Sequence, residues 1–66
     1  MRVQQDKWYL TRDKSSCVLV KQLVSDEHGY VCEAVCSDGV DRNERGMIYR
    51  STYDKKDLVR EIQVCM

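Results

Sequence analysis

The residues best suited to chemistry lie in the stretch HGYVCEAVC, where His28, Cys32 and Cys36 follow one another at four-residue spacing. On a helix these side chains would stack about 6 Å apart along one face, a geometry from which a zinc site can form. On a strand, residues four apart are separated by roughly 13 Å, beyond the reach of one metal ion or one disulfide. The secondary structure of this stretch therefore decides its chemistry.

The stretch has the features of a strand that follows a hairpin turn. Val31 and Val35 are β-branched, and Gly29 stands where a hairpin needs a positive φ. Cysteine acts on such a strand as a compact hydrophobic residue, and the close Cys-x-x-Cys pairs typical of zinc sites are missing from the sequence. We therefore expect no metal and no cofactor. The small-residue face that we expect to point inward consists of Cys32, Ala34 and Cys36.

The four cysteines, at positions 17, 32, 36 and 65, also bear on the cellular compartment. The N-terminus lacks an apolar run of signal-peptide length, and no segment approaches the ~20 apolar residues of a membrane span. The sequence therefore predicts a soluble, cytoplasmic protein without a membrane partner, in which the cysteines are free thiols. A disulfide between Cys17 and Cys36 is the alternative in an oxidising compartment.

A catalytic role would require His28 to act as a general base for a cysteine nucleophile. His28 is the only histidine, and it lies in a predicted exposed turn beside Asp26 and Glu27. The carboxylates of Asp38 and Asp41 lie in a polar loop, where solvated charge is normal. A chain of 66 residues also has little room for a pocket that excludes water. We expect a protein that is not an enzyme.

The elements that position these residues are short strands. Aromatic and β-branched runs, separated by polar turns, predict five of them. They span residues 7–12, 17–24, 30–37, 46–53 and 58–64. Between the last two strands we expect one helical turn at residues 54–57. A longer C-terminal helix is the alternative, but it would stack Lys56 on Arg60 and Asp57 on Glu61, two like-charge pairs at four-residue spacing.

This order of four strands, one helical turn and a fifth strand resembles the small SH3-like barrels, the group that includes Tudor-type and KOW-type modules. Gly46 and the pair Asp57 and Leu58 are the residues that match this group. The resemblance covers most of the chain. It implies a mainly β fold, a small five-stranded SH3-like barrel with one short helical turn, as a single domain over residues 1–66. The sequence contains no aromatic cage and no KOW glycine motif, so the resemblance assigns no binding residues.

The charge balance bears on the partner. Eleven lysines and arginines offset eleven acidic residues, so no global attraction to nucleic acid is expected. Residues 26–41 carry acidic side chains without a basic one, whereas residues 42–60 carry an excess of basic side chains. The sequence therefore predicts a surface with one acidic and one basic region.

Tryptophan and tyrosine are the aromatic residues of this chain, and both types are favoured where one edge of the ring is packed and the other is wet. On a strand over residues 46–53, Met47 and Tyr49 would point inward, whereas Ile48 and Arg50 would point outward. Arginine and aromatic side chains are enriched at binding hot spots. We therefore expect a binding surface that consists of Arg42, Arg45, Ile48, Tyr49, Arg50 and Tyr53.

Two functions fit this surface. The first is a protein-binding module or regulator that contacts a protein partner or a second copy of the chain. The short length is typical of accessory proteins from phages and mobile elements. The alternative is a nucleic-acid-binding module in which tyrosines stack on bases. Its phosphate contacts would come from Arg42, Arg45, Arg50, Lys55, Lys56 and Arg60. The zero net charge places protein binding first, and no small-molecule substrate is evident.

Overall fold

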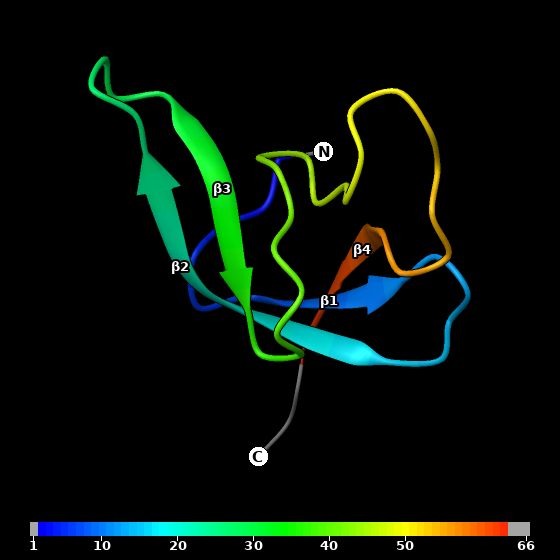
Figure 1. Cartoon of the computed structure of the whole chain (residues 1–66). Coiled ribbons are helices and arrows are strands. Elements are labelled where there is room, and N and C mark those ends of the chain that lie inside the picture. Colours follow the sequence, from blue (N-terminus) through cyan, green and yellow to red (C-terminus); the bar gives the residue numbers. More distant parts are fainter. Residues whose placement is uncertain (1, 64–66) are drawn as a thin grey trace.

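A computed structural model describes residues 2–63 of the chain, apart from the side chain of Cys32 (Figure 1). In this part of the chain, the strands form one antiparallel sheet in the order β3-β2-β1-β4. They are β1 (Trp8–Thr11), β2 (Cys17–Ser25), β3 (Val31–Cys36) and β4 (Leu58–Ile62). The prediction of a mainly β fold is confirmed. The predicted last strand is present as β4, but its expected end at Val64, and Cys65 with it, lie outside the described residues.

β2 is the longest strand, and it serves both halves of the sheet. Its first part pairs with β1, where Tyr9 lies opposite Val18, and its second part pairs with β3, where Leu23 lies opposite Ala34. The register shifts after Val20, and β2 curves between its two partners (Figure 1). Because of this curvature, side chains from all of the strands meet in one core.

The core is small and built mainly from alternate strand positions. Its buried hydrophobic residues are Val3, Tyr9, Val18, Val20, Ala34, Cys36 and Leu58. Tyr9 supplies the aromatic ring of this cluster, and its hydroxyl accepts a hydrogen bond of 2.8 Å from the backbone N–H of Gln4. The polar end of the ring is therefore satisfied, as buried polar groups generally are. A domain of this size buries only about 60% of its unfolded surface, so its stability margin is narrow.

The strand conformation of β3 decides which chemistry is open to its cysteines. Ala34 and Cys36 are buried on the inner face of this strand, as predicted. Cys17, which is exposed, and Cys36 are both free thiols in the structure. Burial raises the pKa of the Cys36 thiol, which disfavours the thiolate that a nucleophile or metal ligand requires.

The turn between β2 and β3 is organised by Asp26, whose Oδ1 accepts hydrogen bonds from the N–H groups of His28 (2.9 Å) and Tyr30 (3.0 Å). Gly29 adopts a φ of +85° there, as the hairpin prediction requires. His28 is exposed, as predicted, and its Nε2 lies 3.4 Å from the carboxylate of Glu27. Among the described side chains, no three metal-ligating groups lie close enough to hold an ion.

The predicted fourth strand at residues 46–53 does not form. Pairing with the outer edge of β3 is limited to one bridge, in which the N–H of Arg42 donates to Ala34 O at 3.0 Å. Asn43 then starts a tight turn, because its Oδ1 accepts hydrogen bonds from the N–H groups of Arg45 (2.9 Å) and Met47 (3.1 Å). The chain therefore leaves β3 before a strand can extend.

The predicted helical turn at residues 54–57 is not confirmed, and the segment forms one hydrogen-bonded turn, in which the N–H of Asp57 donates to Asp54 O at 3.0 Å. No helix occurs in residues 2–63. It follows that this part of the chain offers no helix with the length and apolar character needed to cross a membrane.

Candidate binding face around Arg50

One buried carboxylate holds both ends of the segment between Ile48 and Asp54. Asp57 is fully buried. Its Oδ1 accepts a hydrogen bond of 3.0 Å from the N–H of Ile48, and its Oδ2 accepts one of 2.9 Å from the N–H of Asp54. Arg12 adds an ion pair, with Nη2 3.4 Å from the same Oδ2. Residues 49–53 therefore leave the body of the domain as a loop that is closed at its base (yellow to orange in Figure 1).

This loop carries exposed aromatic rings. Tyr49 is 55% exposed and Tyr53 is 79% exposed. The guanidinium of Arg12 lies 4.4 Å from the centre of the Tyr53 ring, within the range of a cation–π contact. The prediction that Tyr49 points inward and Ile48 outward is wrong, because Ile48 is the half-buried residue of the two. The segment is not a strand, so alternate residues do not share a face.

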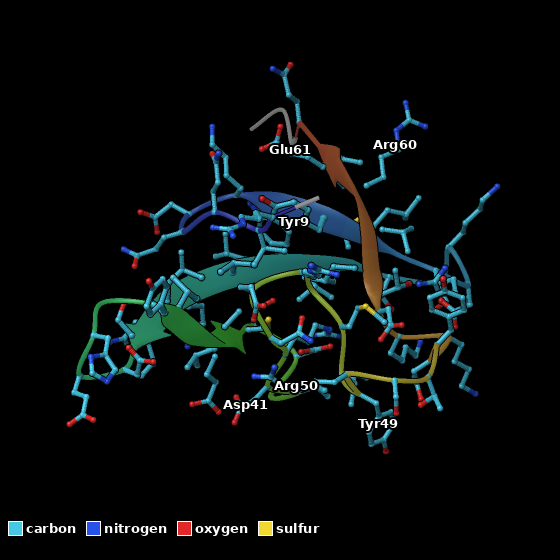
Figure 2. The ribbon with its side chains drawn as sticks, turned by 90° about the horizontal axis from the view of Figure 1, so that it is seen from above. Tyr9, Asp41, Tyr49, Arg50, Arg60 and Glu61 are labelled. Carbon is cyan, nitrogen blue, oxygen red and sulfur yellow. The ribbon has the colours of Figure 1, made fainter. Side chains whose placement is uncertain are left out.

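Arg50 lies where three surface hollows meet. One hollow, of about 340 Å³, is lined by Glu33, Asp41, Arg42, Asn43, Ile48 and Arg50, and we call it the acidic hollow. A second, of about 240 Å³, is lined by Arg45, Met47, Arg50, Ser51 and Tyr53, and we call it the arginine hollow. A third, of about 220 Å³, is lined by Asn43, Glu44, Arg45, Met47 and Arg50. Figure 2 shows Arg50 on the same side of the molecule as Asp41 and Tyr49.

Two carboxyl groups lie together in the acidic hollow. Glu33 comes from β3, and Asp41 comes from the segment that bridges to β3 through Ala34 and Arg42. A side-chain hydrogen bond with Asp41 and the negative charge of Asp41 raise the pKa of Glu33. Close contact with a second acidic side chain therefore disfavours ionisation of Glu33.

The arginine hollow has the opposite character. Arg45 and Arg50 are exposed, and no carboxylate among residues 2–63 lies within ion-pair distance of either guanidinium. No acidic residue lines this hollow, and half-buried Met47 contributes an apolar side chain to it. The result is a small surface depression with cationic walls.

Arg42 does not belong to this surface, although the sequence predicted it there. Its side chain is fully buried and donates to both carboxylate oxygens of Asp38, at 3.0 and 2.8 Å. The guanidinium also donates to Lys56 O and Val40 O. Hydrogen bonding to Arg42 holds the pKa of Asp38 below its usual value. Arg42 therefore ties two loops to the sheet and is not accessible to a partner.

The six basic residues of the nucleic-acid hypothesis do not gather on one face. Arg42 is buried, and the Nζ of Lys56 lies 3.3 Å from the carboxylate of Asp13. Arg60 projects from β4 on the side of the molecule opposite Arg50 (Figure 2). Of this set, Arg45 and Arg50 are the exposed residues that line a hollow together, because Arg42, which also lines a hollow with Arg50, is buried.

Met47, Ser51, Glu33 and Asp41 line these hollows but were not predicted as site residues. The pairing of Glu33 with Asp41 has no signal in the sequence, because it depends on the bridge between Ala34 and Arg42. The turn that shapes the arginine hollow does have a signal. Asn43 followed by a glycine three residues later is typical of a tight turn.

Comparisons with models of protein families, with curated proteins and with solved structures gave no match to this chain.

Proposed function

We propose that this chain is a small protein-binding module or regulator that contacts its partner through a face centred on Arg50. The binding face consists of Arg45, Met47, Ile48, Tyr49, Arg50 and Tyr53. The observation that carries the proposal is the position of Arg50, which lines all three hollows described above and is exposed. Arginine and tyrosine side chains grouped at a hollow are the usual anchors of protein interfaces.

The size of the two hollows beside Arg45 and the construction of the face support a macromolecular partner. Each of the two hollows beside Arg45 has a volume of about 220 to 240 Å³, below the range of about 300–1,000 Å³ typical of small-molecule sites. Such hollows can receive single side chains of a partner. The face is also held in place beforehand, because Asp57 closes the base of the Tyr49 to Tyr53 loop. A preorganised face loses less conformational entropy on binding.

The same proposal includes an SH3-like barrel fold and a cytoplasmic location for the protein. The first three strands, a hydrogen-bonded turn at residues 54–57 and a final strand β4 support the resemblance, whereas the fourth strand of that order does not form. The bridge between Ala34 and Arg42 lies where a fourth barrel strand would pair with β3. The free thiols of Cys17 and Cys36 suit a reducing compartment. A binding role, without catalysis, is supported by exposed His28 and buried Cys36.

Two features favour a protein over a nucleic acid as the partner. The acidic hollow adjoins the arginine hollow at Arg50, so the carboxylates of Glu33 and Asp41 would repel a phosphate chain that crosses this face. Arg60 lies on the opposite side of the molecule and cannot extend the basic surface around Arg50 (Figure 2).

Affinity capture with matched charge-reversal variants tests this proposal. The tagged wild-type protein, Arg50→Glu and Arg60→Glu are each incubated with a nuclease-treated lysate of the source organism. We expect a protein partner that is captured by the wild type and by Arg60→Glu but is lost with Arg50→Glu. If all three forms capture the same proteins, or if capture requires intact nucleic acid, the proposal is wrong.

A further inference from the structure

The arginine hollow has a composition that selects among protein partners. Its lining includes two arginines, a methionine, a serine and a tyrosine, and no carboxylate. Within residues 2–63, the guanidinium groups of Arg45 and Arg50 form no ion pair and donate no hydrogen bond. We propose that this hollow binds an acidic peptide segment of the partner, with one carboxylate held between the two guanidinium groups and an adjacent apolar side chain packed on Met47. This inference rests on the proposed protein-binding function.

The chemistry of the lining fits a carboxylate. A guanidinium presents several N–H donors in a planar arrangement that matches the two oxygens of a carboxylate. Ser51 and Tyr53 add hydroxyl groups that can donate to the same anion. Met47 is unbranched and adaptable, so it can accommodate different apolar side chains next to the acidic one.

The residues that line the hollow are held by contacts that do not use the guanidinium groups of Arg45 and Arg50. The backbone of Arg45 is held by Asn43 Oδ1 at 2.9 Å, and the following N–H of Gly46 donates to Asn43 O at 2.9 Å. On the other side, Tyr53 rests against the Arg12 guanidinium. Both cationic side chains therefore remain available while the backbone that carries them is positioned.

The electrostatic surroundings distinguish an acidic peptide from a nucleic acid. The acidic side chains of Glu33 and Asp41 line the adjoining hollow, which Arg50 also lines. A peptide can place a single carboxylate in the arginine hollow and turn away from this acidic pair. A polynucleotide carries a phosphate at every residue and would bring several of them against the pair.

An NMR titration with a defined probe tests this inference. The probe is the acetylated and amidated peptide Leu-Glu-Leu-Glu-Leu, and its counterpart with glutamine for glutamate is the matched control. We expect saturable shifts of the backbone amides of Arg45, Met47, Arg50 and Ser51. The glutamine peptide should bind about tenfold or more weakly, because hydrogen bonds to a charged group contribute about 1.5–3 kcal/mol.

Variants of the chain locate the effect. Arg45→Gln and Arg50→Gln should each weaken binding of the glutamate peptide about tenfold, whereas Arg60→Gln, on the opposite side, should leave it unchanged. Arg45 and Arg50 are exposed, so neither substitution should disturb the core. The dispersion of each NMR spectrum reports whether the fold is intact.

Several outcomes would overturn the inference. These are equal binding of the two peptides, shifts confined to other residues, tighter binding of an oligothymidylate of the same charge, or concentration-dependent self-association that occupies the hollow with a second copy. If the glutamate peptide fails but Arg50→Glu still abolishes capture of a protein, the partner is not acidic and the proposed function stands. If both experiments fail, the proposed function fails as well.

Discussion

Arg42 and Arg50 are separated by eight positions in the sequence, yet they have opposite environments. Arg42 is fully buried and uses its guanidinium on Asp38 and on two backbone carbonyls. Arg50 is exposed and makes no such contact with residues 2–63. The difference arises at Asn43, where a tight turn takes the chain from the edge of β3 to the surface. Residue type alone therefore does not separate a structural arginine from one that can bind a partner.

The two regions around these arginines also differ in how they could change during evolution or engineering. Removing one partner from a buried charge pair leaves the other charge without compensation, which is costly. Removing an exposed and unpaired charge leaves no such defect. We therefore expect stability to depend on Arg42 and recognition to depend on Arg50.

The largest expected effect follows from replacing these two arginines with the same residue. Arg42→Met should reduce the free energy of unfolding by about 3–5 kcal/mol, the usual loss when one member of a buried ion pair is removed. A 66-residue domain has a total stability of roughly 3–10 kcal/mol at 0.05–0.15 kcal/mol per residue, so this loss is a large fraction of the total. Arg50→Met should change stability by about 0.5 kcal/mol or less.

Urea unfolding followed by circular dichroism measures both variants. Equal losses would break the comparison, because they would make Arg50 a structural residue as well. A folded Arg42→Met protein with wild-type stability would show that the contacts of Arg42 to Asp38 and Lys56 do not hold the loops. A strongly destabilised Arg42→Met protein beside an Arg50→Met protein of nearly wild-type stability is the expected result.

A smaller effect is expected at Gly46, which lies in the turn between Arg42 and Arg50 and packs against the core. Gly46 has a φ of +78°, and an added Cβ would lie 2.8 Å from Leu58 Cβ and 3.0 Å from Val3 Cγ1. Gly46→Ala should cost about 1–2 kcal/mol for the left-handed backbone and about 1–3 kcal/mol more for the collision. Thermal and urea unfolding measure this loss.

Gly39→Ala is the matched control. Gly39 has nearly the same φ, +79°, but no atom lies within 4 Å of its added Cβ. This variant should therefore lose only the backbone contribution of about 1–2 kcal/mol. If the two alanine variants lose the same stability, the close approach of Gly46 to Leu58 has no energetic weight.

The sequence predicted the parts of the fold that depend on local pattern. The strands at β1, β2 and β3, the hairpin with Gly29 and the inward face of Ala34 and Cys36 follow from alternation and turn residues. The segment from residue 46 to 53 has an equally good alternation but forms a loop. Its backbone forms hydrogen bonds with Asp57 and Leu58 and not with a neighbouring strand. These two residues lie farther along the sequence and become neighbours of the segment only through folding.

The candidate site was predictable to a lesser extent for the same reason. Residue types identified Arg45, Arg50 and Tyr53 as surface binding residues, and the structure places these three around one hollow. The burial of Arg42 depends on Asp38 and on Lys56 O, which approach it from two different loops. Local sequence carries no information about such a three-way contact.

The smallest expected effect concerns Glu33 and Asp41, the acidic pair beside Arg50. This pair extends the comparison to a surface charge that opposes folding. The groups that face Glu33 are Asp41, Arg42 and Arg50, with Asn43 and Ile48 completing the hollow. Because contact with Asp41 raises the pKa of Glu33, the folded state binds this proton more tightly than the unfolded state does. The pair therefore contributes most to stability at low pH. This contribution is lost as the pH rises from the unfolded pKa of Glu33 through its folded value.

Glu33→Gln mimics the protonated side chain and should remove this loss. The variant should be more stable than the wild type at pH 7, and the difference should shrink as the pH falls toward about 4, the ordinary pKa of a glutamate. The pKa of Asp38, lowered by Arg42, gives both proteins the opposite trend at lower pH, so it cancels when variant and wild type are compared at each pH. Glu61→Gln, on the other side of the molecule, is the control (Figure 2). Urea unfolding from pH 4 to 8 measures the difference, and a constant offset over this range would mean that Glu33 and Asp41 do not interact.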